Sequence, residues 1–245
     1  MPPLTSNFAE WPAESRIFPV SSLDLKVIDG PHPYHLSEAE AAASNWMLEI
    51  ARNPALFDGR MLLQRAVCIS DGAVSGEAHV VPYSTFLLWR RTRPRAAAVH
   101  LFGMPVLLSG DGAVIAIRMG RHTANPGRVY CAAGSLDAGD IRDGCCDIDG
   151  NMAREVSEET GLDLGAAQAD PGFHGLCHDG VVVLFKRYRF ENTAAELIER
   201  IADHIAREPA PEIEEGLAIR CADPQLHAYP GFMPLILDWV FTRGW

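Results

Sequence analysis

The chain has 245 residues, of which 48% are hydrophobic and 22% are charged, a balance typical of a globular protein with a substantial core. Its formal net charge of −11 argues against a protein that binds nucleic acid polymers or anionic membranes through a general basic surface. No apolar run approaches the roughly 20 residues needed to span a bilayer, and we expect no signal peptide at the polar, proline-containing start.

The first hundred residues predict a small α+β region. Residues 1–20 are rich in proline and polar side chains, and we expect them to wrap the surface. The predicted elements that follow are a helix over 37–52 capped by Ser37, a β-hairpin of 59–70 and 74–83, and a helix from Ser84. The polar run 92–98 contains a proline and is the best boundary, so we predict an N-terminal region over 1–97.

The rest of the chain, 98–245, predicts a second domain of α+β class. Its predicted elements are a hairpin of 99–109 and 113–120, a short strand over 128–134, a helix over 149–161, a hairpin of 173–177 and 181–190, a helix over 193–207, a strand over 214–221 and a helix over 232–244. Hairpins mixed with helices favour a mixed sheet between helices over a doubly wound parallel sheet. No glycine-rich nucleotide-binding loop follows any predicted strand.

The helix over 149–161 is crowded with carboxylates. Glu155, Glu158 and Glu159 stand at i, i+3 and i+4, so all three lie on one helix face, and Arg154 can pair with Glu158 one turn on. Asp147 is the expected N-cap, and Gly161 suits the left-handed residue that ends a helix. Like charges this close repel, whereas carboxylate oxygens are the ligands that Mg²⁺ prefers. The pattern therefore predicts either a solvated acidic face or a divalent-cation site.

This segment resembles the Nudix box, G-x5-E-x7-R-E-U-x-E-E-x-G-U, where U is bulky and aliphatic. Every fixed position of the second half is matched, by Arg154, Glu155, Val156, Glu158, Glu159, Gly161 and Leu162. In the first half Gly134 is followed after five residues by Asp140, which replaces the usual Glu. Thirteen residues, 141–153, then stand where the family has seven. The resemblance covers about 98–245 and implies a Nudix-type α/β/α sandwich with a mixed sheet.

The resemblance also implies a chemistry. Nudix enzymes hydrolyse the pyrophosphate bond of a nucleoside diphosphate linked to another group, with Mg²⁺ or Mn²⁺ as cofactor. Carried over by position, the metal ligands are Glu155, Glu158, Glu159 and the backbone carbonyl of Ala133, and Arg154 orients a carboxylate. The general base is either Glu158 or a glutamate of the late run at 212–215, which contains Glu212, Glu214 and Glu215; Glu214 is our candidate.

Two further segments beside the box concern the substrate. Arg118, Arg121 and Arg128 precede the box closely in an acidic chain, and arginine suits bidentate contact with phosphate, so we predict that they bind substrate. The insertion 141–153 is expected to form a longer loop at the mouth of the site. The expected partner is a small nucleotide-type molecule, with no nucleic acid polymer and no membrane, and a homodimer is left open.

Two alternatives to the hydrolase belong to other functional classes, a binding module and an isomerase. The altered centre of the box favours a Nudix-like module that binds a nucleotide without hydrolysing it, although such a module has no need to keep the glutamates. A Nudix-type isomerase acting on a prenyl diphosphate would need an additional His/Glu metal cluster, which the sequence lacks. The six cysteines show no zinc-finger spacing, so we expect free thiols and a cytoplasmic location.

Overall fold

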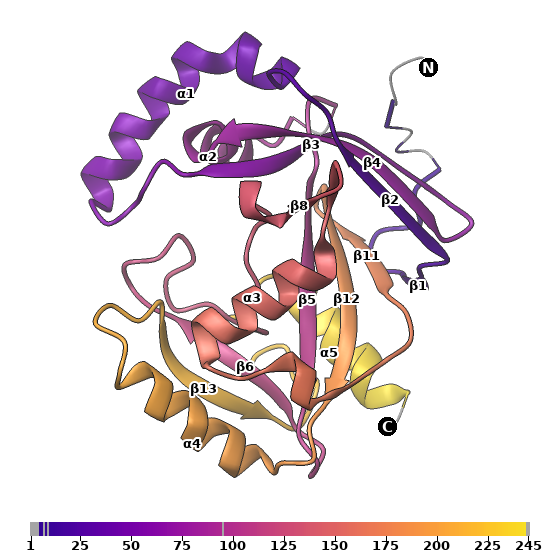
Figure 1. Ribbon diagram of the computed structural model, residues 1–245, viewed down its shortest axis with the longest axis vertical. Coiled ribbons are helices and arrows are strands. Elements are labelled where there is room, and N and C mark those ends of the chain that lie inside the picture. Colours follow the sequence, from indigo (N-terminus) through magenta and orange to yellow (C-terminus); the bar gives the residue numbers. More distant parts are fainter. Residues whose placement is uncertain (1–4, 7, 9, 95, 244–245) are drawn as a thin grey trace.

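The computed structural model describes residues 5–6, 8, 10–94 and 96–243, and it has two β-sheets with helices packed around them (Figure 1). The large sheet has the strand order β1 (Ile17–Pro19), β11 (His174–His178), β12 (Val181–Arg189), β5 (His100–Leu108), β6 (Val114–Met119) and β13 (Ile213–Ile219), with β10 (Gln168–Ala169) on β12 and β7 (Val129–Tyr130) on β6. The small sheet has the order β3 (Arg60–Ser70), β4 (Ala73–Pro82), β2 (Ser22–Val27), β9 (Cys145–Cys146) and β8 (Ile141–Arg142).

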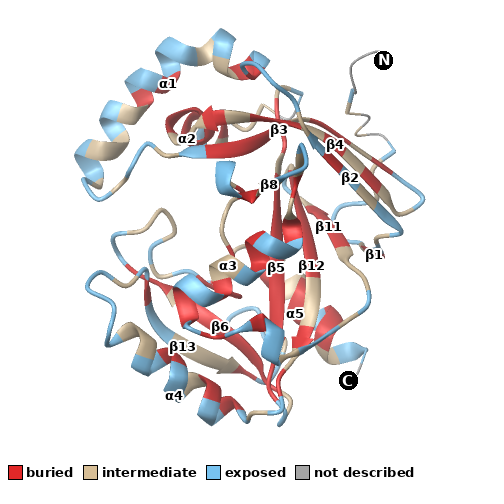
Figure 2. Cartoon of the chain, viewed as in Figure 1, coloured by how far each residue is buried: buried red, intermediate tan, exposed pale blue. Residues whose placement is uncertain are grey.

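The large sheet is mixed, as predicted. β12 and β5 run parallel in its centre, and the hairpins β5–β6 and β11–β12 add antiparallel pairs. Both central strands are buried almost throughout, which explains why they read as continuous apolar runs and not as alternating ones (Figure 2). The predicted α+β class is confirmed.

Helices cover both faces of the large sheet. α3 (Ile148–Thr160) packs on β5, where Gly103 lets it approach: a Cβ there would lie 2.9 Å from a methyl group of Ile148. α5 (Phe232–Thr242) covers the other face, with the Phe232 ring 5.6 Å from that of Phe102. α4 (Ala194–Ile205) packs on β13 through Ile201, beside Gly216. These contacts place α3, which carries the acidic cluster, against the centre of the sheet.

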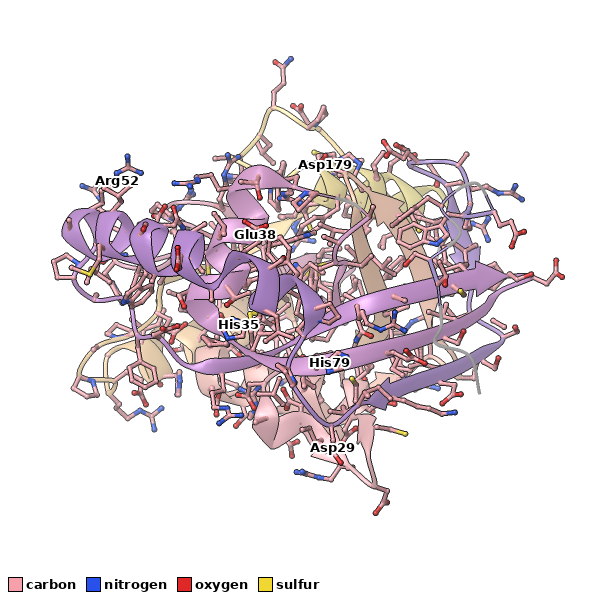
Figure 3. All side chains as sticks on the ribbon, turned by 90° about the horizontal axis from the view of Figure 1, so that it is seen from above. Asp29, His35, Glu38, Arg52, His79 and Asp179 are labelled. Atoms are coloured by element: carbon pink, nitrogen blue, oxygen red, sulfur yellow. The ribbon has the colours of Figure 1, made fainter. Side chains whose placement is uncertain are left out.

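A second, smaller core lies beneath α1 (Pro33–Arg52) and α2 (Tyr83–Thr92). Tyr34 and Ala42 of α1, Phe86 and Trp89 of α2 and Leu63 of β3 belong to it. Figure 3 shows α1 from above, with His35 and Glu38 near its start and Arg52 at its far end. The predicted hairpin β3–β4 and the predicted helix at α2 are confirmed.

Three sequence-based expectations differ from the structure. The first helix begins at Pro33 with His32 as its N-cap, because the His32 ring accepts the Tyr34 N–H at 3.0 Å, so Ser37 is not the cap. The prediction that residues 1–20 wrap the surface fails at Ile17–Pro19, which pairs with β11, and at residues 1–4, 7 and 9 it lies outside the described residues. The insertion is no simple loop: it forms the hairpin β8–β9 and the first turns of α3.

Each of the two parts of the chain contributes a strand to the sheet of the other part. β1 comes from the N-terminal region but pairs with β11 of the large sheet, and β9 comes from the insertion but pairs with β2 of the small sheet through Lys26 and Cys145. The boundary at residues 97 and 98 stays a prediction. Within the described residues, no helix combines the length and apolarity needed to cross a membrane.

Candidate active site

A cavity of about 590 Å³ lies where α2 and α3 meet the loops that contain residues 123–128, 133–135, 212 and 230–231. The acidic residues lining it are Glu155, Glu158, Glu159 and Glu212. The N-terminal region lines it with Arg93 and with four residues of α2, Tyr83, Phe86, Trp89 and Arg90. A larger cavity of about 720 Å³, between the start of α1 and the small sheet, contains none of these carboxylates. The smaller cavity is therefore the candidate site.

The ends of α3 are set by local sequence, as predicted. Asp147 caps the first turn by accepting the Gly150 N–H at 2.9 Å, and Gly161 ends the helix with φ of 69°. Ile148, Met152 and Val156 are buried and repeat every four residues, so this face packs on the sheet. The acidic face then turns toward the cavity.

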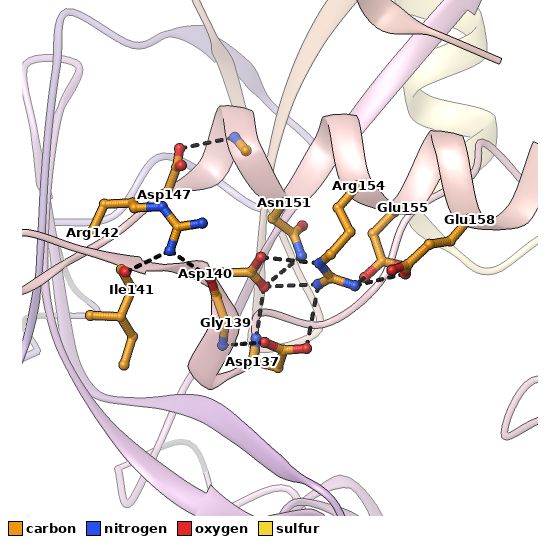
Figure 4. A network of polar contacts seen from close by, with 11 residues as sticks. Asp137, Gly139, Asp140, Ile141, Arg142, Asp147, Asn151, Arg154, Glu155 and Glu158 are labelled. Carbon is orange, nitrogen blue, oxygen red and sulfur yellow. Dashed lines mark hydrogen bonds and ion pairs between the residues drawn. The ribbon is translucent and has the colours of Figure 1, made fainter. Parts of the chain in front are cut away.

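Arg154 is held by a ring of carboxylates (Figure 4). Its Nη2 lies 2.9 Å from Asp140 Oδ2, and its Nη1 lies 2.8 Å from Glu155 Oε1 and 2.9 Å from Glu158 Oε2. Asp140 is only 4% exposed and also accepts from the Asn151 side chain at 2.9 Å and from the Asp137 N–H at 2.9 Å. Asp140, although shorter than the usual Glu, therefore reaches α3. Arg154 is held by Asp140 at Nη2 and by Glu155 and Glu158 at Nη1.

Gly134 has a steric reason to be glycine. A Cβ at this position would overlap the carboxylate of Glu155. The glycine therefore lets the loop after β7 close onto α3, and both residues line the cavity.

Two glutamates of α3 are buried together without full compensation. Burial raises the pKa of Glu155 to about 7, against the opposing pull of Arg154. Burial, followed by the charges of Glu155 and Glu212, raises the pKa of Glu159 well above its usual range. Glu159 is 8% exposed, and no described residue hydrogen-bonds its Oε2. A cation among these oxygens would offset both the burial of the carboxylates and the repulsion between them.

The three glutamates of the run at 212–215 lie in three different environments. Glu212 lines the cavity, and its charge acts on Glu155 and Glu159. Glu214 instead lies 3.8 Å from Arg121, and Glu215 lies 2.7 Å from Arg118, and neither lines the cavity. Of these three residues the structure therefore brings Glu212, and not the predicted Glu214, to the carboxylate cluster.

The predicted arginines are divided as well. Arg128 lines the cavity and donates to the Tyr229 carbonyl at 3.1 Å, whereas Arg118 and Arg121 do not line it. Arg90 of α2 and Arg93, the residue after this helix, line it too, although they are not among the predicted binding residues. The signal that could have indicated them is the segment "RRTRPR" at 90–95, which holds four arginines in an acidic chain and overlaps the predicted boundary at 92–98.

The fit to a metal rests on oxygen donors. Ala133, whose carbonyl is the predicted ligand, lines the cavity, and its backbone opposes the rise in the pKa of Glu159. Across the residues that the structure describes, no three or more His, Cys, Asp or Glu side chains converge as a ready metal site, and the Arg154 guanidinium bridges Glu155 and Glu158. The buried, unpartnered Oε2 of Glu159 and the all-carboxylate donor set still fit a hard divalent cation.

Comparison with known proteins finds similar solved structures. The MutT protein from Methanosarcina mazei Go1 is 13% identical with a TM-score of 0.40, covering 59% of this chain and 94% of its own. The NUDIX domain of Shewanella oneidensis NrtR, complexed with ADP ribose, is 12% identical with a TM-score of 0.40, covering 64% and 97%. A NUDIX hydrolase from Nitrosomonas europaea is 18% identical with a TM-score of 0.36, covering 60% and 92%.

These similar structures are Nudix proteins, the family whose box the residues around Arg154 resemble. Neither a protein-family model nor a curated protein sequence matches the chain.

Proposed function

We propose that this chain is a divalent-metal-dependent hydrolase that cleaves a pyrophosphate bond in a nucleoside diphosphate linked to another group. The observation that carries the proposal is that Glu159 lines one cavity with three other glutamates, Glu155, Glu158 and Glu212, while its buried Oε2 finds no hydrogen-bond partner among the described residues. Buried carboxylates without cations are costly, and a surface of merely solvated charge would leave them exposed.

Glu155, Glu158 and Glu159 would hold the metal, Mg²⁺ or Mn²⁺, together with the Ala133 carbonyl. The bound metal supplies Lewis acidity that offsets phosphate charge and lowers the pKa of water. Arg154 positions Glu155 and Glu158, and Asp140 positions Arg154 in turn. Glu212 is our candidate for the general base, in place of Glu214, because it lies in the cavity and Glu214 is paired with Arg121 outside it.

A second function is favoured by one observation. Arg154 bridges Glu155 and Glu158 directly, so each of the two carboxylates already has a cationic partner without a metal. A module that binds a nucleotide without hydrolysing it would have this arrangement permanently. The hydrolase is preferred because the ion pairs of Arg154 within the described part of the chain do not include Glu159, whose buried Oε2 has no hydrogen-bond partner there.

Other features fit a small-molecule enzyme. All six cysteines are free, as expected for a reducing compartment, and the cytoplasmic location stays a prediction. A homodimer likewise stays a prediction.

The test is a hydrolysis screen with Mg²⁺ or Mn²⁺ over nucleotide sugars, dinucleotides, ADP-ribose and nucleoside triphosphates. Each substrate is run with the wild type, with Glu159→Gln and with Glu199→Gln, a matched change at an exposed glutamate of α4. The hydrolase predicts metal-dependent cleavage that only Glu159→Gln removes. Nucleotide binding without any cleavage would establish the binding module instead.

A further inference from the structure

A row of aromatic rings lines the cavity and joins the two parts of the chain. Tyr83 and Phe86 of α2 lie 5.8 Å apart, Phe86 lies 4.7 Å from His100 of β5, and His100 stacks on Phe102 at 5.1 Å. Phe102 meets Phe232 at the start of α5 at 5.6 Å. All five rings line the cavity that holds the carboxylates.

The row presents ring surface to the cavity and is supported from behind. Phe86 and Phe102 are 4% and 7% exposed, whereas Tyr83, His100 and Phe232 keep intermediate exposure. A wall of this kind, in which buried rings alternate with partly open ones, can stack a planar ring at little entropic cost. At about 590 Å³ the cavity lies in the range of small-molecule sites.

His100 belongs to the row as a neutral ring. Its Nε2 lies 3.2 Å from the Ser135 hydroxyl, next to Gly134 of the box, which fixes the plane of the imidazole. Burial, followed by the charges of Arg90 and Arg93, lowers the pKa of His100 to about 3. An uncharged imidazole between Phe86 and Phe102 stacks as an aromatic ring.

Positive charge accompanies the row. Arg90 uses Nη2 to bind the Ala124 carbonyl and the Asn125 side chain, both at 2.9 Å. In the part of the chain that the structure describes, neither Arg90 nor Arg128 has a carboxylate within ion-pair distance, although both line the cavity. Unpaired guanidinium groups beside aromatic rings suit an anionic molecule that carries a planar ring.

We propose that α2 of the N-terminal region is the substrate-selecting wall of this active site. A heteroaromatic ring of the substrate, of nucleobase type, stacks on the row from Tyr83 to Phe232, and an anionic group of the same molecule binds Arg90. The inference rests on the proposed function in taking the carboxylate cluster as the place of hydrolysis. It assigns the N-terminal region a role in choosing the substrate.

The test compares two kinds of non-hydrolysable probe by calorimetry in the presence of Mg²⁺. The ring-bearing probes are the α,β-methylene analogues of ADP, GDP, CDP and UDP, and the ring-free probe is methylenediphosphonate. We expect at least one ring-bearing probe to bind about tenfold or more tightly than the ring-free probe, since stacking on an aromatic side chain has this magnitude.

Variants then locate the effect. Tyr83→Leu should weaken the ring-bearing probe about tenfold and leave the ring-free probe unchanged, whereas Tyr83→Phe, which keeps the ring, should bind like the wild type. Phe57→Leu removes a ring that is 83% exposed and lies outside the cavity, and it is the matched control. If Tyr83→Leu does not fold, as judged by circular dichroism, Phe232→Leu takes its place.

The outcomes separate this inference from the hydrolase. Equal affinity for all five probes, or an equal loss for both kinds of probe in Tyr83→Leu, would overturn the stacking wall. Metal-dependent hydrolysis that is equally efficient with ring-free diphosphates would also overturn it while leaving the hydrolase intact. Ring-dependent binding without any hydrolysis would support the wall and reject the hydrolase.

Discussion

Asp140 accepts two hydrogen bonds from Arg154, from Nη2 at 2.9 Å and from Nε at 3.3 Å, and it does so from a position that is almost completely buried. Asp140 lies at the end of the 3₁₀ turn Ala138–Asp140, and Arg154 lies in the middle of α3. The pair therefore connects the loop of Gly134 to the helix that carries the glutamates.

Asp140→Ala should lower both stability and activity. The change leaves Arg154 and the Asn151 amide without their buried acceptor, and we expect a loss of about 2 kcal/mol, less than for a fully buried pair because Arg154 is 31% exposed. The measurement is urea unfolding followed by circular dichroism, with Asp203→Ala on the exposed side of α4 as control. A variant as stable as the control would show that Asp140 does not hold Arg154.

Gly134→Ala should affect activity much more than stability. The new methyl group overlaps the Glu155 carboxylate, which is the end of a flexible side chain and can rotate away. We expect a change in unfolding free energy of less than about 1 kcal/mol, but a fall in kcat of about tenfold or more, because Glu155 leaves the cluster. Gly172→Ala is the control, since its Cβ would meet nothing within 4 Å. A normal kcat in Gly134→Ala would contradict a role for the observed Glu155 position.

Local signals explain why α3 and the hairpins could be predicted. Asp147 and Gly161 mark the ends of α3, and the β11–β12 turn has Asp179 and Gly180 at positive φ, as tight hairpin turns require. The strand Ser22–Val27 and the hairpin β8–β9 could not be predicted in this way. β2 pairs with β4 in parallel across a long separation, and strands of two residues carry no periodicity.

One part of the candidate site can likewise be predicted from local sequence, and the other part depends on tertiary packing. Glu155, Glu158 and Glu159 are neighbours on one helix turn, so their spacing alone brings them together. The α2 wall reaches them only through tertiary packing, since Arg90 is held to the loop before the box by Asn125. No pattern within α2 itself indicates that it faces the carboxylates, and the distinction between Glu212 and Glu214 depends in the same way on a loop conformation.

Mg²⁺ should stabilise the wild type and not Glu159→Gln. Binding to the folded state alone raises stability by mass action, by about 2.7 kcal/mol when the free metal is a hundred times its Kd. Without metal the variant should be at least as stable as the wild type, because it replaces a buried carboxylate whose Oε2 has no partner. The measurement is Tm with EDTA and with increasing Mg²⁺, and Glu199→Gln should respond like the wild type. An equal Mg²⁺ response in Glu159→Gln would remove this residue from the metal site.

Acid should destabilise the small core through His32. The ring is 0% exposed, and its Nδ1 must stay unprotonated to accept the Tyr34 N–H at the start of α1. Burial, followed by the charge of the neighbouring His79, lowers the pKa of His32 from 6.5 to about 4. The positive charges of Arg65 and of protonated His35 lower this pKa as well. His32 therefore becomes protonated at a lower pH in the folded state than in the unfolded state.

The sign of the pH dependence follows from this order. As pH falls below about 6.5 the unfolded state binds a proton that the folded His32 refuses, so stability is lost progressively until pH reaches about 4. At pH 5 the loss from this one group is about 2 kcal/mol. His32→Asn keeps a side chain that can cap α1 but cannot titrate, so its stability should fall less between pH 7 and pH 5. Urea unfolding of both proteins at the two pH values gives the difference, and equal losses would mean that His32 is not the group that responds.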